Sequence, residues 1–290
     1  MAMQYAVALP QLGRAASAES IMATARLAEE LGYSDVWVND HIGFAPSTEH
    51  PSPRLYDPLS CLALALAATS RIGLSSHINA AYYPPVYLAK VLASLDSLSG
   101  GRIKIAVGAG WQKAEFDAMG SDFHTRGKRT NEIIAVLRSC WENGHCAFAG
   151  EFYTFPEVKI SPPPAHRIEV WIAGTTPPAC DRATRLGDGY QGLPTRREPV
   201  TYDRQTGVSA LPALIRSLRA HRPDPSSFRV SMYTHDWDPG ESDPDAIRRE
   251  RDFFEQAGVQ HVVAALARRD ADSWLRAVED LARILEIERS

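Results

Sequence analysis

Residues 170–193 read VWIAGTTPPACDRATRLGDGYQGL and contain one complete strand–helix–strand unit. The β-branched and aromatic run Val170–Ala173 predicts a buried strand. Thr-Thr-Pro-Pro predicts the start of a helix, because threonine can cap a helix whose first residue is proline. Gly187 predicts the end of that helix, and Gly189–Leu193 predicts the next strand. Parallel sheets covered by helices are built from such units.

The same alternation of strand and helix recurs along the whole chain. Helical segments place apolar residues on one face, as Ile21, Ala25 and Ala28 do near the N-terminus. Three expected helices end at a glycine, Gly32, Gly187 or Gly258, and glycine favours the left-handed conformation of a helix end. The eight expected strands are Tyr5–Leu9, Asp35–Asn39, Ile72–Ile78, Ile103–Val107, Val170–Ala173, Gly189–Leu193, Phe228–Tyr233 and His261–Leu266.

Eight such units without a change of composition between them predict the α/β class and a single (β/α)8 TIM-type barrel over residues 1–290. A chain of 290 residues with 44% hydrophobic residues has the size and the apolar content for one such barrel. A doubly wound open sheet is the alternative.

Charge and hydropathy exclude several partners. A net charge of −4 and a pI near 6.1 leave no basic surface for nucleic acid, so we expect no nucleic-acid partner. The longest apolar run, residues 62–68, is too short for a membrane span, and the N-terminus lacks the features of a signal peptide. We therefore expect no membrane partner and a cytoplasmic location.

Cysteine and histidine spacing gives no support for a metal site. The four cysteines, Cys61, Cys140, Cys146 and Cys180, form no C-x-x-C pair and are expected to be reduced and to fill the core. The nine histidines show no H-x-x-x-H or H-E-x-x-H spacing, so we expect no bound metal.

In a barrel the chemistry belongs to the residues that follow each strand. Asp40 and His41 follow the second strand, and each has a structural and a functional interpretation: a loop-orienting carboxylate and a rim histidine, or an acid–base pair. The sequence Gly-Ala-Gly at 108–110 does not complete a dinucleotide fingerprint. Thr-Thr-Pro-Pro is an ordinary helix start or a phosphate site, and the basic residues at 126–129 form a solvated turn or hold an anionic tail.

Several of these stretches, in this order, resemble the luciferase-like monooxygenase superfamily, and in particular its branch of coenzyme F420-dependent oxidoreductases. The resemblance implies a TIM-type barrel that binds a flavin or a 5-deazaflavin at the carboxyl ends of its strands, as a homodimer. The stretches that carry it are LGYSDVWVNDH (31–41), TSRIGL (69–74), GGRIKIAVGAGW (100–111) with Glu115 and Phe116, RGKRTNE (126–132) and VWIAGTTPPA (170–179).

The resemblance also implies roles for individual residues. Asp40 and His41 match a pair beside the cofactor ring, with His41 as the general acid or base and Asp40 contacting both His41 and the cofactor. The chain departs from the sugar and alcohol dehydrogenases of the family at two places: Trp111 stands where they carry a general-acid glutamate, and Phe44 lies only near the place of their tryptophan. Trp111 and Phe44 are therefore expected to line an apolar substrate pocket, and Glu115 to bond to backbone at a helix start. A bulged third strand, with a non-prolyl cis peptide that supports the ring, is expected at Ser76, His77 and Ile78. The residues expected to hold the cofactor phosphate are Ala109, Gly110, Gly174, Thr175 and Thr176.

The sequence therefore predicts an oxidoreductase that transfers hydride between coenzyme F420 and a small organic substrate. The alternative within the same class is an FMN-dependent monooxygenase that uses reduced FMN and oxygen. A barrel lyase or isomerase and a catalytically silent flavin-binding relative are the alternatives from other classes. A lyase would need a Schiff-base lysine or a carboxylate pair at the strand ends, and the silent relative would lack His41.

Overall fold

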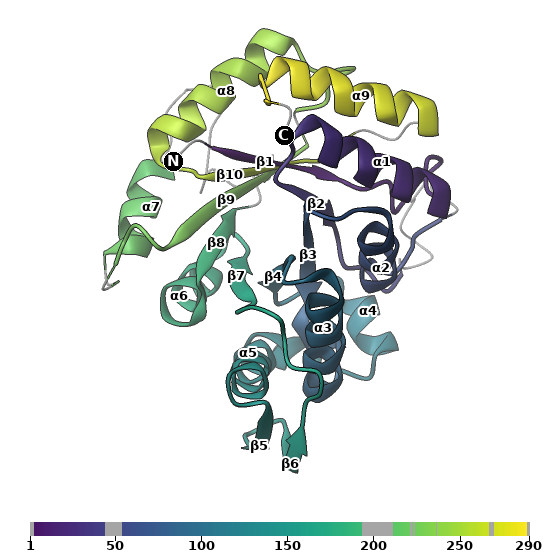
Figure 1. The fold of residues 1–290 in the computed structure, drawn as a ribbon. Helices are drawn as coiled ribbons and strands as arrows, with labels where there is room; N and C mark the ends of the chain where they lie inside the picture. The colour runs from purple at the N-terminus through teal and green to yellow at the C-terminus, as the bar shows by residue number, and fades with distance from the viewer. Residues whose placement is uncertain are drawn as a thin grey trace.

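The eight predicted strands close into one parallel barrel in a computed structural model of the chain (Figure 1). The structure describes residues 3–43, 54–192, 211–220, 222, 224–235, 237–266 and 270–288. The barrel strands are β1 (Gln4–Ala8), β2 (Asp35–Val38), β3 (Gly73–Asn79), β4 (Ile103–Gly108), β7 (Glu169–Ala173), β8 (Gly189–Gly192), β9 (Arg229–Thr234) and β10 (His261–Ala264).

Strand order around the barrel is β1-β10-β9-β8-β7-β4-β3-β2, and every neighbouring pair is parallel. Because β1 pairs with both β2 and β10, the sheet is closed, which confirms the (β/α)8 prediction and excludes the open sheet. The helices around it are α1 (Ala18–Leu31), α2 (Pro58–Ala68), α3 (Pro85–Ser99), α4 (Lys113–Ala118), α5 (Arg126–Asn143), α6 (Pro177–Leu186), α7 (Leu211–Arg219), α8 (Pro244–Ala257) and α9 (Ala271–Ile284), with the 3₁₀ turns η1 (Ala80–Tyr82) and η2 (Phe123–Thr125).

The third strand differs from the prediction. Residues Leu74–Asn79 of β3 pair one-to-one with Ile103–Gly108 of β4, so no extra residue is left for a bulge. The cis peptide expected near His77 is also wrong: in the described ranges the only cis bond is Ser161–Pro162. Because β3 keeps a regular register with β4, its peptide bonds can all remain trans.

An antiparallel hairpin, β5 (His145–Ala149) and β6 (Thr154–Lys159), projects from the barrel between α5 and β7 (Figure 1). It is pinned by a disulfide bond between Cys140 of α5 and Cys146 of β5, whose Cα atoms are 5.0 Å apart. Gly144, with φ 70°, reverses the chain between helix and strand and brings the two cysteines together. The expectation of reduced thiols is therefore wrong for this pair and correct for Cys61 and Cys180.

Two of the three predicted glycine helix ends are left-handed. Gly32 and Gly258 have φ values of 88° and 92°. Gly187 is extended instead, with φ −88°, and a Cβ there would lie 2.8 Å from the carbonyl oxygen of Gly189. Close approach of backbone, rather than a left-handed turn, explains this glycine.

The barrel interior is filled by side chains, not hollow. Its lower layer is a buried polar network in which Asp35 lies 2.7 Å from Lys104 Nζ and 2.9 Å from His261 Nε2. Above it, the rings of Trp37 and Trp171 pack against His261 at centroid distances of 6.2 and 5.1 Å. A ligand can therefore reach the barrel only at its ends. In the described part of the chain, no helix has the length and apolarity needed to cross a membrane.

Candidate active site

The carboxyl ends of β2, β3 and β4 lie side by side and bring several predicted site residues together. Val38 pairs with Ser76, and Asn79 pairs with Gly108. The segments that follow these strands therefore share one mouth of the barrel. Ser76 and Ile78 are themselves buried within β3, whereas His77 is only half-buried.

Asp40 is a buried carboxylate that joins β2 to β3. Its side chain is 2% exposed; Oδ2 accepts a hydrogen bond from Asn79 N at 2.7 Å, and Oδ1 accepts one from the Tyr83 hydroxyl at 2.9 Å. Burial raises the pKa of Asp40 to about 7, although Asn79 and Tyr83 act in the opposite direction. This geometry matches the loop-orienting interpretation of Asp40, because its carboxylate bonds to Asn79 and Tyr83 and not to the His41 ring.

The carboxylate that faces His41 comes from α4. Glu115, 3% exposed, places its two oxygens 3.3 and 3.4 Å from His41 Nδ1. Its Oε1 also accepts hydrogen bonds from Ile42 N at 2.7 Å and Gly43 N at 3.2 Å, and its Oε2 accepts one from the Tyr82 hydroxyl at 2.8 Å. Backbone bonding by Glu115 matches the prediction. Its contact with His41 was missed, because only the folded loop brings positions 74 residues apart together.

His77 is a second histidine at this mouth, and it projects over β4. A Cβ at Gly108 would lie 2.4 Å from His77 Nε2, so glycine is needed there for the ring to fit. Burial lowers the pKa of His77 to about 4, and the charge of His41 acts in the same direction. His77 is therefore neutral at ordinary pH, and the two rings cannot readily carry a proton at the same time.

The Gly-Ala-Gly segment turns the chain at the end of β4. Gly110 has φ 79°, and a Cβ there would lie 2.8 Å from the Phe116 ring. Arg126 Nε donates to the Gly110 carbonyl at 3.2 Å. Directly after this turn, the Trp111 side chain is 69% exposed and meets His41 edge-on at a centroid distance of 6.3 Å. Trp111 thus lies at the mouth, where a substrate wall was expected; Phe44, its predicted partner, lies outside the described residues.

A second glycine segment leaves the neighbouring strand β7. Val107 pairs with Ile172, so Ala109 and the segment 174–176 emerge from adjacent strands. Gly174 has φ 137°, and Thr175 and Thr176 lead into α6, which begins at Pro177 as predicted. The Thr176 side chain makes no capping hydrogen bond. Pro177 and Pro178 lack N–H groups, and the N–H groups of Ala179 and Cys180 donate to the Thr176 carbonyl at 2.9 and 3.0 Å. The N–H groups left for an anion are therefore those of Thr175 and Thr176, just before the helix.

Basic residues surround this segment. Arg182 of α6, 7% exposed, donates from Nη2 to the Gly127 carbonyl at 3.0 Å and from Nε to Asn131 Oδ1 at 2.6 Å. These bonds hold the start of α5 against α6. The partial positive end of α5 and the charge of a buried arginine thus lie close together, and such a place favours an anion.

Two further polar residues of the barrel interior had no sequence pattern to identify them. Gln191 on β8 is fully buried, and neither its amide nitrogen nor its amide oxygen has a hydrogen-bond partner. The Tyr233 hydroxyl on β9 accepts a hydrogen bond from Asn39 Nδ2 at 2.6 Å. The only sequence signal for Gln191 was a polar residue within a short predicted strand. Because its neighbour Tyr190 is an ordinary core residue, the strand gave no reason to single out Gln191.

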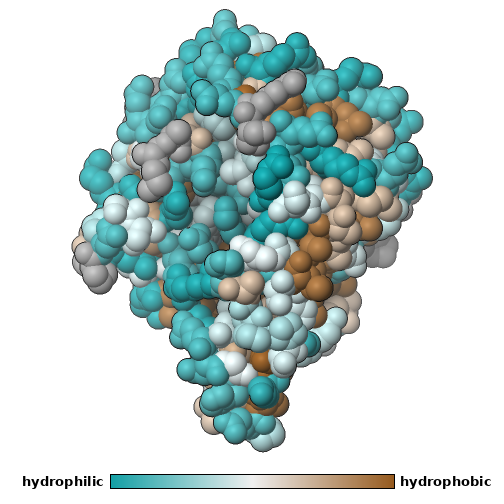
Figure 2. Space-filling view, viewed as in Figure 1, coloured by the Kyte–Doolittle hydropathy of each residue, from teal (hydrophilic) through white to brown (hydrophobic). Residues whose placement is uncertain are grey.

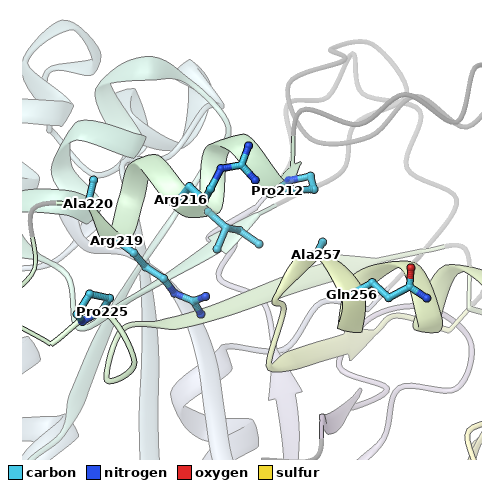
Figure 3. A pocket seen from close by; sticks show the side chains of 8 residues that line it. Pro212, Arg216, Arg219, Ala220, Pro225, Gln256 and Ala257 are labelled. Atoms are coloured by element: carbon cyan, nitrogen blue, oxygen red, sulfur yellow. The ribbon is translucent and has the colours of Figure 1, made fainter.

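Two hollows on the described surface lie away from this mouth. Figure 3 shows one of about 380 Å³ between α7 and α8, with Arg216 and Arg219 on one side and Gln256 on the other. It is built from helices on the outside of the barrel and contains no residue of a strand end. A larger one, of about 630 Å³, is lined by Gln4, Tyr5 and the chain after α9, at the opposite end of the barrel. Neither includes a predicted site residue.

The candidate site residues converge on the carboxyl ends of the barrel strands. This is the arrangement of (β/α)8 enzymes, in which the loops after the strands carry the chemistry. The model of the luciferase-like monooxygenase family matches residues 3–233, and the chain belongs to that family.

Individual relatives share part or all of the fold. The FMNH(2)-dependent dimethylsulfone monooxygenase of Pseudomonas fluorescens (strain Pf0-1) is 32% identical over 171 residues, which are 57% of this chain and 45% of that protein. The pyrimidine monooxygenase RutA of Pantoea ananatis (strain LMG 20103) is 35% identical over 137 residues, 46% of this chain and 38% of that protein. The matches thus span less than half the length of these curated relatives.

Among solved structures, an F420-dependent secondary alcohol dehydrogenase in complex with an F420-acetone adduct superposes with a TM-score of 0.79 at 20% identity, covering 98% of this chain and 99% of that one. EDTA monooxygenase from Chelativorans sp. BNC1 superposes with a TM-score of 0.78 at 14% identity, covering 99% and 94%. At these identities the likeness establishes the shared fold.

Proposed function

We propose that the protein is an oxidoreductase that transfers hydride between coenzyme F420 and a small organic substrate. The observation that carries the proposal is the position of His41: it is paired with a buried carboxylate at a barrel mouth where two adjacent strands end in glycine segments. Hydride transfer to or from a carbon–oxygen or carbon–carbon centre is accompanied by proton transfer, for which an imidazole is suited near neutral pH.

The residues of the mouth fit a cofactor of this kind. Gly110 and Gly174 allow close backbone approach, and the backbone N–H groups of Thr175 and Thr176 lie just before α6, whose dipole favours a phosphate at that end. Arg182 and the start of α5 supply positive potential for an anionic tail. We assign the phosphate to Ala109, Gly110, Gly174, Thr175 and Thr176, as the sequence predicted. A bound deazaflavin supplies or accepts the hydride, whereas the protein supplies orientation and electrostatics.

In this proposal each remaining side chain has a defined task. His41 exchanges the substrate proton, while neutral His77 and the buried Asp40 shape the surface beneath the ring. Trp111 forms an apolar wall of the substrate pocket, because an aromatic side chain that is 69% exposed beside His41 gains from being covered by an apolar ligand.

An FMN-dependent monooxygenase is the second candidate. The specific observation in its favour is that the relative with 32% identity is named for FMNH(2) dependence. Both cofactors carry a phosphate on a ribityl-type side chain, so the glycine segments suit either. The ring chemistry distinguishes them, not the anion site.

The decisive experiment is thermal unfolding with oxidised and reduced F420 and FMN, each in excess. A ligand at 100 times its Kd stabilises the native state by about 2.7 kcal/mol, which raises Tm by roughly 5 °C or more in a domain of this size. A shift with F420 alone supports the proposal, and a shift with FMN alone supports the second candidate. No shift with any of the four ligands would overturn both. Riboflavin and 5-deazariboflavin, which lack the phosphate, serve as controls and should stabilise much less.

We also propose that the protein is a homodimer formed through α2 and α3. Apolar side chains gather on the side of the molecule where these helices lie (Figure 2). On α3, Tyr87 is 58% and Leu98 74% exposed, and α2 exposes Ala63 and Ala67 where a solvated helix would carry polar residues. Leu98→Glu should shift the sedimentation behaviour toward monomer, whereas Met119→Glu, at an exposed apolar residue after α4, should not. A monomeric wild type would contradict this proposal. We further propose that the protein is located in the cytoplasm.

A further inference from the structure

Glu115 is a buried carboxylate with four partners, all of which belong to the candidate site. Two are backbone N–H groups of the loop that follows His41, one is the Tyr82 hydroxyl, and one is the His41 ring. Burial alone would raise the pKa of Glu115, but hydrogen bonds from His41 and Tyr82 outweigh burial and hold this pKa below its ordinary value. The group is therefore ionised at neutral pH, so a negative charge faces His41 Nδ1.

A charged acceptor at Nδ1 decides where the imidazole carries its proton. With both carboxylate oxygens within 3.4 Å, an unprotonated Nδ1 would point its lone pair at a negative charge. The Gln112 amide nitrogen, at 3.4 Å, would favour the opposite tautomer. A hydrogen bond to an ionised acceptor is about twice as strong as one between neutral groups, so the carboxylate prevails. Gln112 can also rotate its amide and present oxygen instead.

The other charged or titratable groups around His41 cannot take over this task. Asp40 Oδ1 and Oδ2 accept from Tyr83 and Asn79, and His77 on β3 opposes a positive charge on His41. Tyr82 on η1 is directed to Glu115 and stays neutral, because burial and Glu115 raise its pKa.

We propose that Glu115 is the positioning residue of His41: it holds the ring in the Nδ1–H tautomer and turns Nε2 toward the barrel mouth as the nitrogen that exchanges the substrate proton. The transfer of a substrate proton rests on the proposed function, whereas the pairing of Glu115 with His41 is present in the protein without any ligand. A carboxylate that fixes the tautomer of a catalytic histidine is a device found on many unrelated folds.

The test is Glu115→Gln, which keeps an oxygen for the N–H groups of Ile42 and Gly43 but removes the charge. In ¹⁵N NMR spectra of the protein without ligands, wild-type His41 should be Nδ1–H when neutral; its signals are assigned by their loss in His41→Asn. In Glu115→Gln the ring should populate both tautomers, because the charge that favours a proton on Nδ1 is gone.

Two matched variants separate positioning from general disturbance. Tyr82→Phe removes one hydrogen bond to Glu115 but keeps the charge, so the His41 tautomer should not change. Asp40→Asn should likewise leave it unchanged. With a turned-over substrate, Glu115→Gln should lower kcat and change KM less than kcat.

Several results would overturn the inference. Neutral wild-type His41 in the Nε2–H tautomer would do so without any variant, and so would an unchanged Nδ1–H tautomer in folded Glu115→Gln. A larger effect of Asp40→Asn than of Glu115→Gln would transfer the role to Asp40. Failure of every flavin and deazaflavin to bind would remove the proposed function but leave the NMR result standing, so the two failures are distinguishable.

Discussion

Replacing Asp40 by Asn should remove a contribution that destabilises the folded protein as pH rises. Asp40 is 2% exposed, and its pKa in the folded protein is about 7, against 3.8 for the ordinary side chain. Between these two values the folded state holds a proton that the unfolded state has released. The folded state is therefore favoured at low pH, and the Asp40 contribution is lost as pH rises from about 4 to about 7.

The size of the effect follows from the shift. A difference of about 3 pKa units, at 1.36 kcal/mol per unit, corresponds to about 4 kcal/mol of stability. Asparagine has nearly the same shape and never ionises. One oxygen can still accept from Asn79 N, and the Tyr83 hydroxyl can turn to accept from the new amide. Imperfect replacement of these bonds adds a constant offset of about 1 kcal/mol that does not depend on pH.

Only the difference between variant and wild type isolates this term, because His77 opposes it. The pKa of His77 is lowered from 6.5 to about 4, so the folded state binds fewer protons there and gains stability as pH rises through the same window. Asp35, whose pKa is lowered well below 3.8 because Lys104 and His261 outweigh the effect of burial, is ionised throughout it in the folded state, and its contribution cancels in the difference between variant and wild type. The wild type alone can therefore show little net pH dependence.

The assay is urea unfolding of ligand-free protein at half-unit steps from pH 4 to pH 8. The free energy of unfolding of Asp40→Asn minus that of wild type should grow by about 4 kcal/mol from the acid end to pH 8 and then level off. Asp117→Asn, at a side chain that is 60% exposed, is the control and should give a nearly flat difference. A flat difference for Asp40→Asn as well would refute the reasoning.

Three further outcomes are expected. Without reductant, unfolded protein should titrate two thiols, against four after reduction, and Cys140→Ser should give three in both cases; four thiols at the outset would contradict the disulfide bond. Gln191→Met should raise the free energy of unfolding of the ligand-free protein by about 1–3 kcal/mol, since it removes a buried amide without partners, and a destabilised variant in urea unfolding would show that the amide is satisfied. Gly110→Ala should lower the free energy of unfolding clearly more than Gly100→Ala. Both glycines have positive φ, which costs an alanine about 1–2 kcal/mol, but only at Gly110 does the new Cβ meet the Phe116 ring. Equal losses for the two variants in urea unfolding would contradict the packing argument.

The barrel could be predicted because its information is local and repeated. Each strand is a short β-branched run and each helix an apolar stripe, and both periodicities can be read without knowing what packs against them. All eight barrel strands were found in this way. The hairpin β5–β6 was missed, since its exposed strands carry no such run: β6 reads TFPEVK and contains a proline. The disulfide bond was missed with it, because Cys140 and Cys146 meet only through the turn at Gly144.

The candidate site also has a part that the sequence predicted and a part that it did not. Strand ends and glycine segments pointed to Asp40, His41, Gly110 and Gly174 from sequence position alone, since parallel strands necessarily bring their carboxyl ends to one rim. Position could not say which carboxylate faces His41. Asp40 is adjacent to His41 in sequence and was therefore expected to be its partner. Successive residues at a strand end point in different directions, so the Asp40 side chain does not face the His41 ring.

By itself, the sequence determined the eight barrel strands, their alternation with helices and the set of strand-end loops that hold the site, whereas the pairing of β1 with both β2 and β10 showed that the barrel is closed. Only the tertiary structure decided the pairing within that set: Glu115 with His41, Asp40 with Asn79 and Tyr83, and His77 over Gly108. Periodic burial fixes elements from local pattern, whereas hydrogen bonds between side chains depend on ångström-scale distances and directions that arise only when distant loops pack together.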